Sequence, residues 1–384
     1  MHASAQVDLA AIRGNVAALR ERAARGGAEL MAVVKADGYG HGLLPSARAA
    51  LQGGATWLGT ALLDEALALR AAGITGPRLL SWLMGPGERW AEAIRADIDV
   101  SANATWAVEE IAAAAREVGA TARVHLKVDS GLSRGGAALA DWPDLVDAAR
   151  KAEADGAIQV VGLWSHLAYA DAPGHPTIAR QAEAFREAVG LAERAGVRPE
   201  VRHLANSAAT LTVPEHYFDL VRPGIAVYGL SPVPDVGDPA SFGLRPAMTL
   251  SGRFILVKRV PAGSGVSYGH TYVTDRETTL GLVPLGYADG VPRNGGNVAP
   301  LHAAGRRRTV AGRVCMDQLV VDLGDDAAQV GDEVVLFGPG DGGAPTAQDW
   351  ADATDTISYE IVTRVGPRVP RVYIDDVADE GGRA

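Results

Sequence analysis

The chain has 384 residues and a mass of 39.8 kDa, which is too long for one ordinary domain core and predicts two domains. Hydrophobic residues make up 47% and charged residues 21% of the sequence, which excludes an intrinsically disordered protein. The formal net charge of −10 argues against a nucleic-acid-binding surface and against a face that binds anionic membranes.

The sequence favours a cytoplasmic protein. The single cysteine, Cys315, cannot form an internal disulfide, as is usual in a reducing compartment. The first residues lack the basic region and apolar stretch of a signal peptide. The chain also lacks a run of about 18 apolar residues, so we predict no transmembrane helix.

Between residues 30 and 229, short β-like runs alternate with helix-forming segments rich in Ala, Glu and Arg. The eight predicted strands are Leu30–Ala36, Trp57–Leu62, Arg78–Met84, Asp99–Asn103, Ala122–Val128, Val160–Leu167, Val201–Asn206 and Leu220–Tyr228. The clearest predicted helices are Leu63–Ala72, Thr105–Val118 and Ile178–Ala195. This alternation predicts an α/β fold with an N-terminal (β/α)8 barrel. A doubly wound open sheet is the alternative fold.

The composition changes near residues 231–245, where Pro232, Pro234 and Gly237 are among the residues that predict a linker. Runs rich in Val, Leu and Thr follow and predict a mainly-β C-terminal domain. These runs are Met248–Val260, Thr278–Pro284, Arg308–Asp322 and Asp332–Phe337, with a short helix expected near Ala347–Ala353. We therefore predict a barrel domain over residues 1–240 and a β-rich domain over residues 241–384.

Reactive groups in such a barrel lie at the C-terminal ends of its strands. The polar residues at those predicted ends are Lys35, Asn103, Lys127, Asp129, His166, Asn206, Ser207 and Arg222. Lysine is rare in this chain, because only four of the 36 basic residues are lysines, so Lys35 at the end of the apolar run MAVVK needs an explanation. Burial would lower the pKa of its amine and make it a nucleophile. The alternative is a lysine that extends to solvent from a strand end.

A second polar group suits an anion. Ser207 offers a hydroxyl, and Gly224 in the segment Arg222–Ile225 lets backbone N–H groups approach an oxyanion. Tyr39, in the Gly-rich loop after Lys35, could donate a hydrogen bond to a phosphate there. His166 and His203 lack the spacing of metal ligands, so we predict no metal site.

Several motifs, taken in order, resemble those of a known family. They are AVVKADGYGHG, HLKVDSGLSRGG, WSHLAYAD, HLANSAA, VRPGIAVYG, GVSYGHTY, LVPLGYADG, GRVCMDQ and ISYEIVTR. The chain is similar, nearly from end to end, to bacterial alanine racemases, which are pyridoxal-phosphate enzymes of fold type III. The implied reaction is the interconversion of L-alanine and D-alanine, which supplies D-alanine for peptidoglycan.

The resemblance implies a role for each matching residue. Lys35 would hold pyridoxal 5'-phosphate and serve as one catalytic base, and Tyr268 would be the opposite base, supplied by the partner subunit of a homodimer. The residues implied in cofactor binding are Lys35, Tyr39, His166, Asn206, Ser207, Arg222, Gly224, Ile225 and Tyr359. The residues implied in substrate binding are Arg134, Met316 and Tyr287. Lys127 matches a position that is often carbamylated, and no nucleic acid, membrane or metal is implied.

The chain departs from the family pattern at three positions. Gly38 stands where the family often has alanine, and Ser133 stands where glycine is frequent. Gly135 replaces a larger apolar residue. None of these changes removes a chemical group that the implied reaction needs.

Racemisation removes the α-proton on one face and returns a proton on the other, for which two bases suffice. An amine and a phenol have ordinary pKa values of about 10.4 and about 10, so the site must make both act near neutral pH. We therefore predict a bell-shaped pH profile of activity. Arginine does not release its proton, so Arg222 would leave the pyridine nitrogen unprotonated. We hypothesise that the weaker electron sink suppresses transamination.

Three alternatives stay open at this point. A decarboxylase of the same fold type would use a cysteine from the second domain, such as Cys315. A non-catalytic cofactor carrier would resemble the barrel alone. A racemase of wider specificity would also accept serine, because one small change of side chain discriminates by only about 1–3 kcal/mol.

Overall fold

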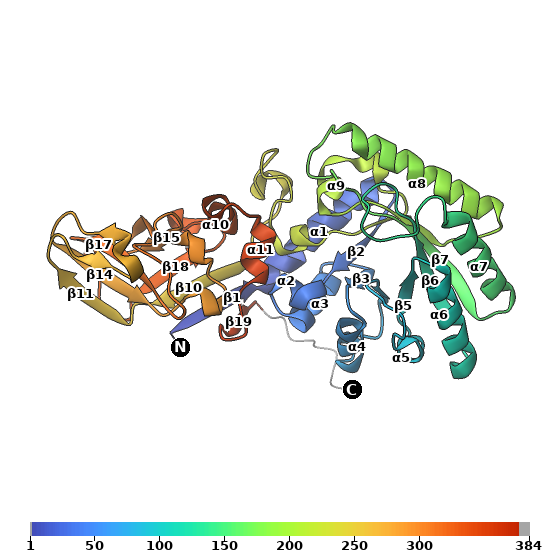
Figure 1. Cartoon of the computed structure of the whole chain (residues 1–384), viewed down its shortest axis with the longest axis horizontal. Helices are drawn as coiled ribbons and strands as arrows, with labels where there is room; N and C mark the ends of the chain where they lie inside the picture. Colours follow the sequence, from blue (N-terminus) through green and yellow to red (C-terminus); the bar gives the residue numbers. More distant parts are fainter. Residues whose placement is uncertain (1, 376–384) are drawn as a thin grey trace.

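The computed structural model describes residues 2–375, which form a barrel of alternating strands and helices beside a strand-rich domain (Figure 1). The outermost residues of the two predicted domain ranges, residue 1 and residues 376–384, lie outside the described part. Within residues 2–375, no helix is long and apolar enough to cross a membrane.

Eight parallel strands build the first domain. They are β2 (Glu29–Val33), β3 (Trp57–Thr60), β4 (Arg78–Ser81), β5 (Asp99–Ala102), β6 (Ala122–Lys127), β7 (Ile158–Trp164), β8 (Val201–His203) and β9 (Leu220–Val221). Their order in the sheet is β8-β7-β6-β5-β4-β3-β2-β9, and β8 and β9 meet through a parallel bridge between Asn206 and Arg222. The predicted (β/α)8 barrel is therefore confirmed, and the open-sheet alternative is wrong.

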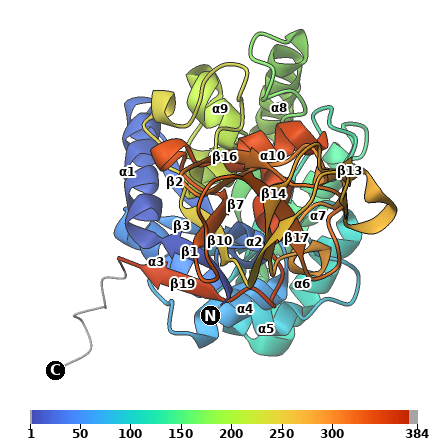
Figure 2. The ribbon, with the colours of Figure 1, turned by 90° about the vertical axis from the view of Figure 1, so that its left-hand side faces the viewer.

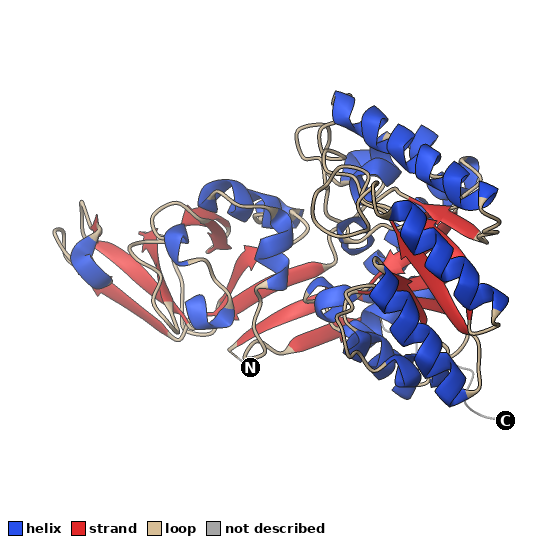
Figure 3. Ribbon diagram, turned by 45° about the vertical axis from the view of Figure 1, so that its right-hand side comes forward, coloured by secondary structure: helices blue, strands red, loops and turns tan. Residues whose placement is uncertain are grey.

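Helices cover the outside of the barrel (Figure 3). They are α1 (Leu9–Arg25), α3 (Leu43–Gln52), α4 (Leu63–Ala71), α5 (Trp90–Arg95), α6 (Thr105–Val118), α7 (Trp142–Ala154), α8 (Pro176–Arg194) and α9 (Ser207–Thr212). Helix α6 shows why they form: its buried Val108, Ile111 and Ala115 recur at helical spacing, and Gly119 ends it in a left-handed conformation. The bounds predicted for α6 are confirmed.

The predicted eighth strand, Leu220–Tyr228, is wrong in its extent. Only β9 is extended, and the chain then turns at Pro223 and Gly224 into a short 3-10 helix, η2 (Ile225–Tyr228). Proline offers no N–H for a strand ladder, and glycine permits the turn that follows. The turn brings the backbone at Gly224 to the mouth of the barrel, where a continued strand would have carried it away.

The second domain is built from three sheets. The strands of the largest, in sheet order, are β16 (Arg306–Thr309), β15 (Pro300–Ala303), β18 (Glu333–Phe337), β10 (Met248–Arg253), β1 (Ala3–Asp8) and β19 (Arg371–Ile374). The smaller sheets hold β11 (Leu256–Val260), β14 (Thr278–Val283) and β17 (Leu319–Gly324), and β12 (Gly265–Val266) with β13 (Tyr272–Val273). Two predicted runs, Met248–Val260 and Arg308–Asp322, are each broken into two strands by a loop.

The first strand of the chain lies in the sheet of the second domain. β1 pairs antiparallel with β10 and parallel with β19, so residues from both ends of the sequence share one sheet (Figure 2). The predicted boundary between residues 240 and 241 stays a prediction. By its residue numbers β1 belongs to the first predicted range, but it pairs with strands of the second.

One buried side chain ties α1 to the linker. The Asn15 amide nitrogen donates to the carbonyl oxygens of Val227 (3.1 Å) and Arg245 (2.9 Å), and its oxygen accepts from the Arg245 backbone nitrogen at 2.8 Å. Because Asn15 is only 2% exposed, these bonds form away from water and hold the linker against the barrel.

Two helices complete the second domain next to the barrel, α10 (Ala347–Thr354) and α11 (Ser358–Thr363). α11 packs on the short turn α2 (Lys35–Tyr39) that follows β2, so the second domain contributes to the mouth of the barrel.

Candidate active site

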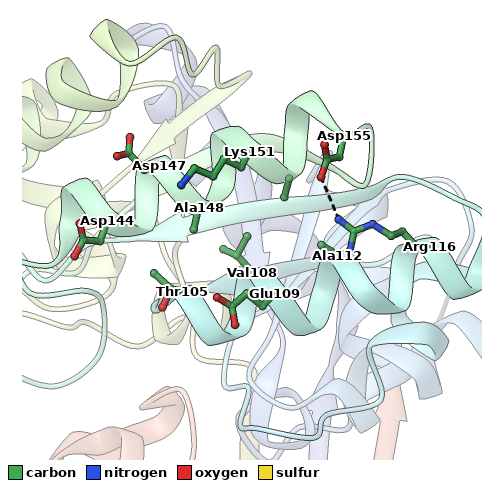
Figure 4. Close-up of a pocket in the computed structure, with 11 residues that line it drawn as sticks. Thr105, Val108, Glu109, Ala112, Arg116, Asp144, Asp147, Ala148, Lys151 and Asp155 are labelled. Atoms are coloured by element: carbon green, nitrogen blue, oxygen red, sulfur yellow. Dashed lines mark hydrogen bonds and ion pairs between the residues drawn. The ribbon is translucent and has the colours of Figure 1, made fainter.

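One hollow, with a volume of about 510 Å³, lies on the outside of the barrel, between α6 and α7 (Figure 4). It is lined mainly by charged surface residues of the two helices, including Glu109, Asp144 and Lys151, and by an Arg116–Asp155 ion pair at 3.3 Å. It does not lie at the C-terminal ends of the strands. We therefore place the candidate site elsewhere.

A smaller cavity of about 280 Å³ lies at the C-terminal ends of the barrel strands. Its lining residues are Val33, Lys35, Tyr39, Trp82, Lys127, Arg134, Trp164, His166, Asn206, Ser207, Arg222, Gly224, Ile225 and Tyr359. Four of them carry a cationic group, and none of these described lining residues is acidic. The cavity therefore suits an anionic ligand.

Lys35 opens an unusual turn. The four residues after it, Ala36 to Tyr39, all have φ between 53° and 61°, so α2 is a single left-handed turn. Each non-glycine residue in this conformation costs about 1–2 kcal/mol, so the surroundings must hold the turn in place. Gly38, with φ of 61°, escapes this cost because it has no Cβ.

Bonds from three elements hold the left-handed turn. The Glu65 carboxylate accepts from the backbone nitrogen of Ala36 at 2.6 Å, and the Asp37 carboxylate accepts from that of Leu43 at 2.7 Å. Arg371, from β19, donates through Nε to the Gly40 carbonyl at 2.9 Å. These bonds fix the backbone on both sides of Lys35 and Tyr39, so both side chains line the cavity.

The surroundings of Lys35 lower the pKa of its amine. Burial lowers the pKa of Lys35, and the nearby Arg134 guanidinium lowers it further, although Glu65 acts in the opposite direction. This confirms the expected direction of the shift. A larger share of neutral amine near pH 7 is what a nucleophile or base requires.

Lys127, the last residue of β6, also lines the cavity. Its Nζ stands 4.2 Å from the centre of the Trp164 ring. Burial and the charges of Arg222 and Arg134 lower the pKa of Lys127 to about 8. A Cβ at Gly135 would lie 3.4 Å from this Nζ, so the glycine leaves space beside the amine.

Arg222 is 4% exposed and held by several acceptors. Its Nη1 donates to Nδ1 of His203 at 3.0 Å, and its Nη2 donates to the Ser165 carbonyl at 2.8 Å. Nη2 also lies 3.4 Å from Nδ1 of His166. Burial and then the charge of Arg222 lower the pKa values of both histidines well below 6.5, so both accept as neutral rings.

Asp129 shapes the loop that carries Arg134. Its Oδ1 accepts from the backbone nitrogens of Gly131 (2.9 Å), Leu132 (2.8 Å) and Ser133 (3.2 Å). Burial acts to raise the pKa of Asp129, but these bonds outweigh it and lower the pKa. Ser133 has φ of 56°, the conformation that a glycine at this position would adopt without strain.

Three hydroxyl groups line the cavity, those of Tyr39, Ser207 and Tyr359. The Ser207 hydroxyl accepts from the Gly224 backbone nitrogen at 2.7 Å, and a Cβ at Gly224 would lie 2.1 Å from the Tyr39 hydroxyl oxygen. Only glycine therefore fits at position 224, where the turn after β9 passes the Tyr39 hydroxyl. Burial raises the pKa values of Tyr39 and of Tyr359, from α11, so both phenols stay protonated as donors.

Three of the predicted site residues, Tyr268, Tyr287 and Met316, lie in the second domain and do not line this cavity. Tyr268 opens η4 (Tyr268–His270) and is 70% exposed; Tyr287 opens η5 (Tyr287–Asp289) and is 41% exposed; Met316, between β16 and β17, is 53% exposed. Hydrogen bonds join their loops: the Ser267 hydroxyl donates to the Arg313 carbonyl at 2.6 Å, and the Tyr287 nitrogen to the Cys315 carbonyl at 3.0 Å. We call these loops, with Tyr268, Tyr287 and Met316, the tyrosine face.

The structure thus brings together the predicted residues of the barrel and α11, and it leaves the tyrosine face apart from them. Asn103, at the end of the fourth predicted strand, does not line the cavity. Sequence reasoning missed Trp82 and Trp164 in the lining, and Glu65 and Asp129 as supports of the loops. Each of the two carboxylates binds backbone nitrogens, a role for which a single sequence carries no signal.

Known proteins resemble both domains. The family described as "Alanine racemase, N-terminal domain" matches residues 7–232, and "Alanine racemase, C-terminal domain" matches residues 247–373. "Alanine racemase" of Frankia casuarinae is 64% identical over 374 residues, which covers 97% of each chain. "Alanine racemase" of Streptomyces coelicolor is 61% identical over 380 residues, covering 98% of this chain and 97% of the relative.

Solved structures agree with the sequence comparison. "Alanine Racemase from Streptomyces coelicolor A3(2)" superposes with a TM-score of 0.96 at 61% identity and covers 98% of both chains. The structure of an alanine racemase from "D-cycloserine producing Streptomyces lavendulae" also has a TM-score of 0.96, at 59% identity, with 97% of both chains covered.

Proposed function

The chain belongs to the alanine racemase family, and from that premise we propose that it interconverts L-alanine and D-alanine with pyridoxal 5'-phosphate in the cavity around Lys35. The observation that carries this proposal is a half-buried lysine of lowered pKa among three further cationic side chains and three hydroxyl donors. The match to the C-terminal family argues against a carrier that resembles the barrel alone.

Pyridoxal 5'-phosphate is the cofactor of this family, and the residues present fit it. A phosphate, a phenolic oxygen and a substrate carboxylate would together bring several negative charges to a cavity whose described lining is cationic and free of acidic groups. When bound, the cofactor supplies an electron sink that makes the α-proton of the amino acid acidic.

Lys35 is the proposed attachment point and one of the two bases. Its lowered pKa lets the amine take up a proton on one face of the substrate near neutral pH. The left-handed turn fixes the backbone that follows Lys35, whose side chain lines the cavity, so this attachment point is in place before a ligand arrives.

Two arginines are proposed to orient the ligands. Arg222, held by His203 and the Ser165 carbonyl, would present its remaining N–H groups to the pyridine nitrogen. Arg134 would contact the substrate carboxylate and the phenolic oxygen, from the loop that Asp129 shapes. Arginine suits both tasks, because its planar fork donates in fixed directions and keeps its charge.

The three hydroxyl groups of the cavity are proposed to bind the phosphate. Tyr39, Ser207 and Tyr359 would donate hydroxyl hydrogen bonds, and the backbone at Gly224 and Ile225 would complete the cradle. The raised pKa values of the two tyrosines support this role, because protonated phenols donate to a phosphate and do not repel it. His166 and Asn206 would line the side of the cofactor.

Tyr268 is the proposed second base, supplied by a second copy of the chain. Its 70% exposure, and its absence from the cavity lining of its own chain, support a tyrosine face that completes the site of a partner in a homodimer. Tyr287 and Met316 would restrict the substrate side chain to about the size of a methyl group.

Lys127 is proposed to be carbamylated. Carbamylation needs a neutral amine, which the lowered pKa supplies, and space, which Gly135 leaves. The product would replace one of the four positive charges with a negative one and so relieve the repulsion among them. We also propose that the enzyme acts in the cytoplasm and supplies D-alanine for peptidoglycan.

The test follows the product and the lysine together. The purified enzyme should form D-alanine from L-alanine, measured by chiral chromatography, with a bell-shaped pH dependence. Borohydride should abolish its visible absorption band and leave a reduced adduct on the Lys35 peptide, detected by mass spectrometry. A cofactor-bound enzyme that forms no D-alanine, or that releases carbon dioxide from lysine or ornithine, would contradict the proposal.

A further inference from the structure

Four polar side chains form a hydrogen-bonded row through the barrel core, from Arg222 at the cavity to Asp99. We call this row the file. Arg222 Nη1 lies 3.0 Å from Nδ1 of His203, and Nε2 of His203 lies 2.9 Å from Nδ1 of His125. Nε2 of His125 in turn lies 3.3 Å from Oδ2 of Asp99. His203, His125 and Asp99 are fully buried, so the file crosses an interior that barrels of this kind usually fill with branched apolar side chains.

Only one arrangement of protons satisfies the whole file. Arginine can only donate, so Nδ1 of His203 must accept and its proton must sit on Nε2. Nε2 of His203 then donates to His125, whose own proton must sit on Nε2 and point to Asp99. Burial lowers the pKa values of both histidines, in agreement with two neutral rings. Every bond in the file therefore runs in one direction, from Arg222 to Asp99.

The far end of the file is anchored. Asp99 accepts from Arg78 Nη2 at 2.6 Å and from Arg123 Nε at 2.5 Å. Burial acts to raise the pKa of Asp99, but the bond from His125 and the charges of Arg78 and Arg123 outweigh it, so the carboxylate stays ionised. An ionised Asp99 is a permanent acceptor, which fixes the proton on Nε2 of His125.

Aromatic rings pack against both imidazoles, whose planes are 73° apart. The His203 ring stacks on Trp164, with centroids 5.5 Å apart and planes 9° apart. The His125 ring meets Trp57 edge to face at 5.7 Å. Imidazoles packed in this way cannot rotate toward other partners. The direction of each hydrogen bond is therefore set by the neighbouring side chain in the file.

We propose that His125 and Asp99 are positioning residues for Arg222, which they orient through His203. Without an acceptor at His125, the Nε2–H of His203 is buried and unpaired. If that proton moves to Nδ1 of His203, this N–H faces the N–H of Arg222 Nη1. Two donors then face each other, and Nη1 of Arg222 loses its acceptor. Arg222 lines the cavity, and within residues 2–375 its Nε makes no hydrogen bond, so a fixed guanidinium keeps one donor for a bound ligand. The inference rests on the proposed function only for what fills the cavity.

The test compares His125→Gln with His125→Leu in the cofactor-loaded enzyme. A glutamine amide carries an acceptor and a donor about as far apart as the two imidazole nitrogens, so it can restore both bonds. Leucine has a similar volume and restores neither. Side-chain ¹⁵N NMR of histidine-labelled protein reports the tautomer of His203, whose signal is assigned by its loss in a His203→Gln variant.

We expect the unsubstituted enzyme and His125→Gln to hold His203 with its proton on Nε2. We expect His125→Leu to lose that single tautomer and to lower kcat by about 10-fold with little change in the KM for alanine, as outer-shell partners typically do. His125→Gln should recover most of kcat. A His125→Leu enzyme with an unchanged His203 tautomer and an unchanged kcat would overturn the proposal, as would equal losses of kcat in both variants.

A second variant covers a failure to fold. If His125→Leu is not recovered as a folded protein, His125→Asn takes its place, because its shorter amide reaches only one neighbour and should show the same loss. The tautomer is read without reference to turnover. A loaded enzyme that forms no D-alanine but keeps the Nε2 proton on His203 would therefore count against the proposed function alone.

Discussion

The barrel cavity and the tyrosine face differ in how completely one chain builds them. Around Lys35 most side chains are half-buried or buried, and their loops are tied by bonds from Glu65, Asp129 and Arg371. On the tyrosine face, Tyr268 is 70% exposed. The contrast teaches that one half of the proposed site is built within the chain, whereas the other half lies open on the surface, where we propose that a second copy covers it.

The largest loss of activity should come from a substitution in the barrel cavity. Lys35→Ala removes both the attachment point and one base, so we expect racemisation to fall by about 10⁴-fold or more. The assay is the rate of D-alanine formation, with circular dichroism to check the fold. Lys151→Ala, at an exposed lysine on α7, is the matched control and should keep full activity. Comparable loss in both variants would show that the assay reports something other than the cavity.

The next largest effect tests whether the two halves come from different chains. Lys35→Ala and Tyr268→Ala should each be inactive alone, and their mixed dimers should regain activity. One site of each mixed dimer then pairs an intact Lys35 with an intact Tyr268. Random exchange of subunits should restore about a quarter of the sites.

The measurement is D-alanine formation after the two variants are co-refolded, with differently tagged chains to confirm mixed dimers. Each variant refolded with itself is the control. Mixed dimers that form but stay inactive would mean that Tyr268 serves the cavity of its own chain.

A smaller effect should be found at Lys127. Burial and the charge of Arg222 lower its pKa to about 8, so the neutral amine becomes the main form as the pH rises above that value. Uptake of labelled bicarbonate as a carbamate should therefore increase through about pH 8, observed by ¹³C NMR. Lys127→Arg should abolish the signal and lower kcat by up to about 10-fold.

The exposed Lys151 serves as an internal reference for this measurement. Its ordinary environment should give no stable carbamate at the same pH. An enzyme that shows no Lys127-dependent signal at any pH would refute the modification and leave the cavity with four positive charges.

The smallest effect concerns the left-handed turn. Gly38→Ala adds a Cβ at a φ of 61° and places it 2.7 Å from the Ser46 hydroxyl oxygen. We expect a loss of unfolding free energy of about 2–4 kcal/mol, the sum of the conformational cost and the crowding. Chemical denaturation measures this loss.

Gly156→Ala is the control for the conformational cost alone. Gly156 also has a positive φ, of 74°, but a Cβ there meets nothing within 4 Å. It should lose only about 1–2 kcal/mol. If the two variants lost equal amounts, the turn beside Lys35 would be no more tightly packed than an open surface loop.

Local patterns predicted the barrel well. Helix α6 and the eight strand positions follow from hydrophobic periodicity and from glycine at the helix ends, which act within a few residues. The extent of the eighth strand was wrong, because the β-branched residues of Leu220–Tyr228 outweighed the break at Pro223 and Gly224 in the prediction. The left-handed conformation of Ala36 and Asp37 carries no local signal either, since Glu65 and Arg371 impose it from a distance.

The site was predicted as a set of side chains but not as a network. Motifs indicated Lys35, Arg222 and Tyr359, and the fold brings them to one cavity. The bonds that link Asp99 to Arg222 depend on β5, β6 and β8 being strands of one closed barrel, with β7 between β6 and β8. Such contacts between distant segments follow from topology, and a sequence pattern alone does not contain them.

The place of β1 between β10 and β19 bears on how the protein is made. On the ribosome, residues 3–8 emerge before their partners at residues 248–253 and 371–374. Strand β1 must therefore wait for these partners while the whole barrel is synthesised. A gene split in the linker would leave one fragment with β1 and without its partner strands, and the other with a gap between β10 and β19 in its main sheet.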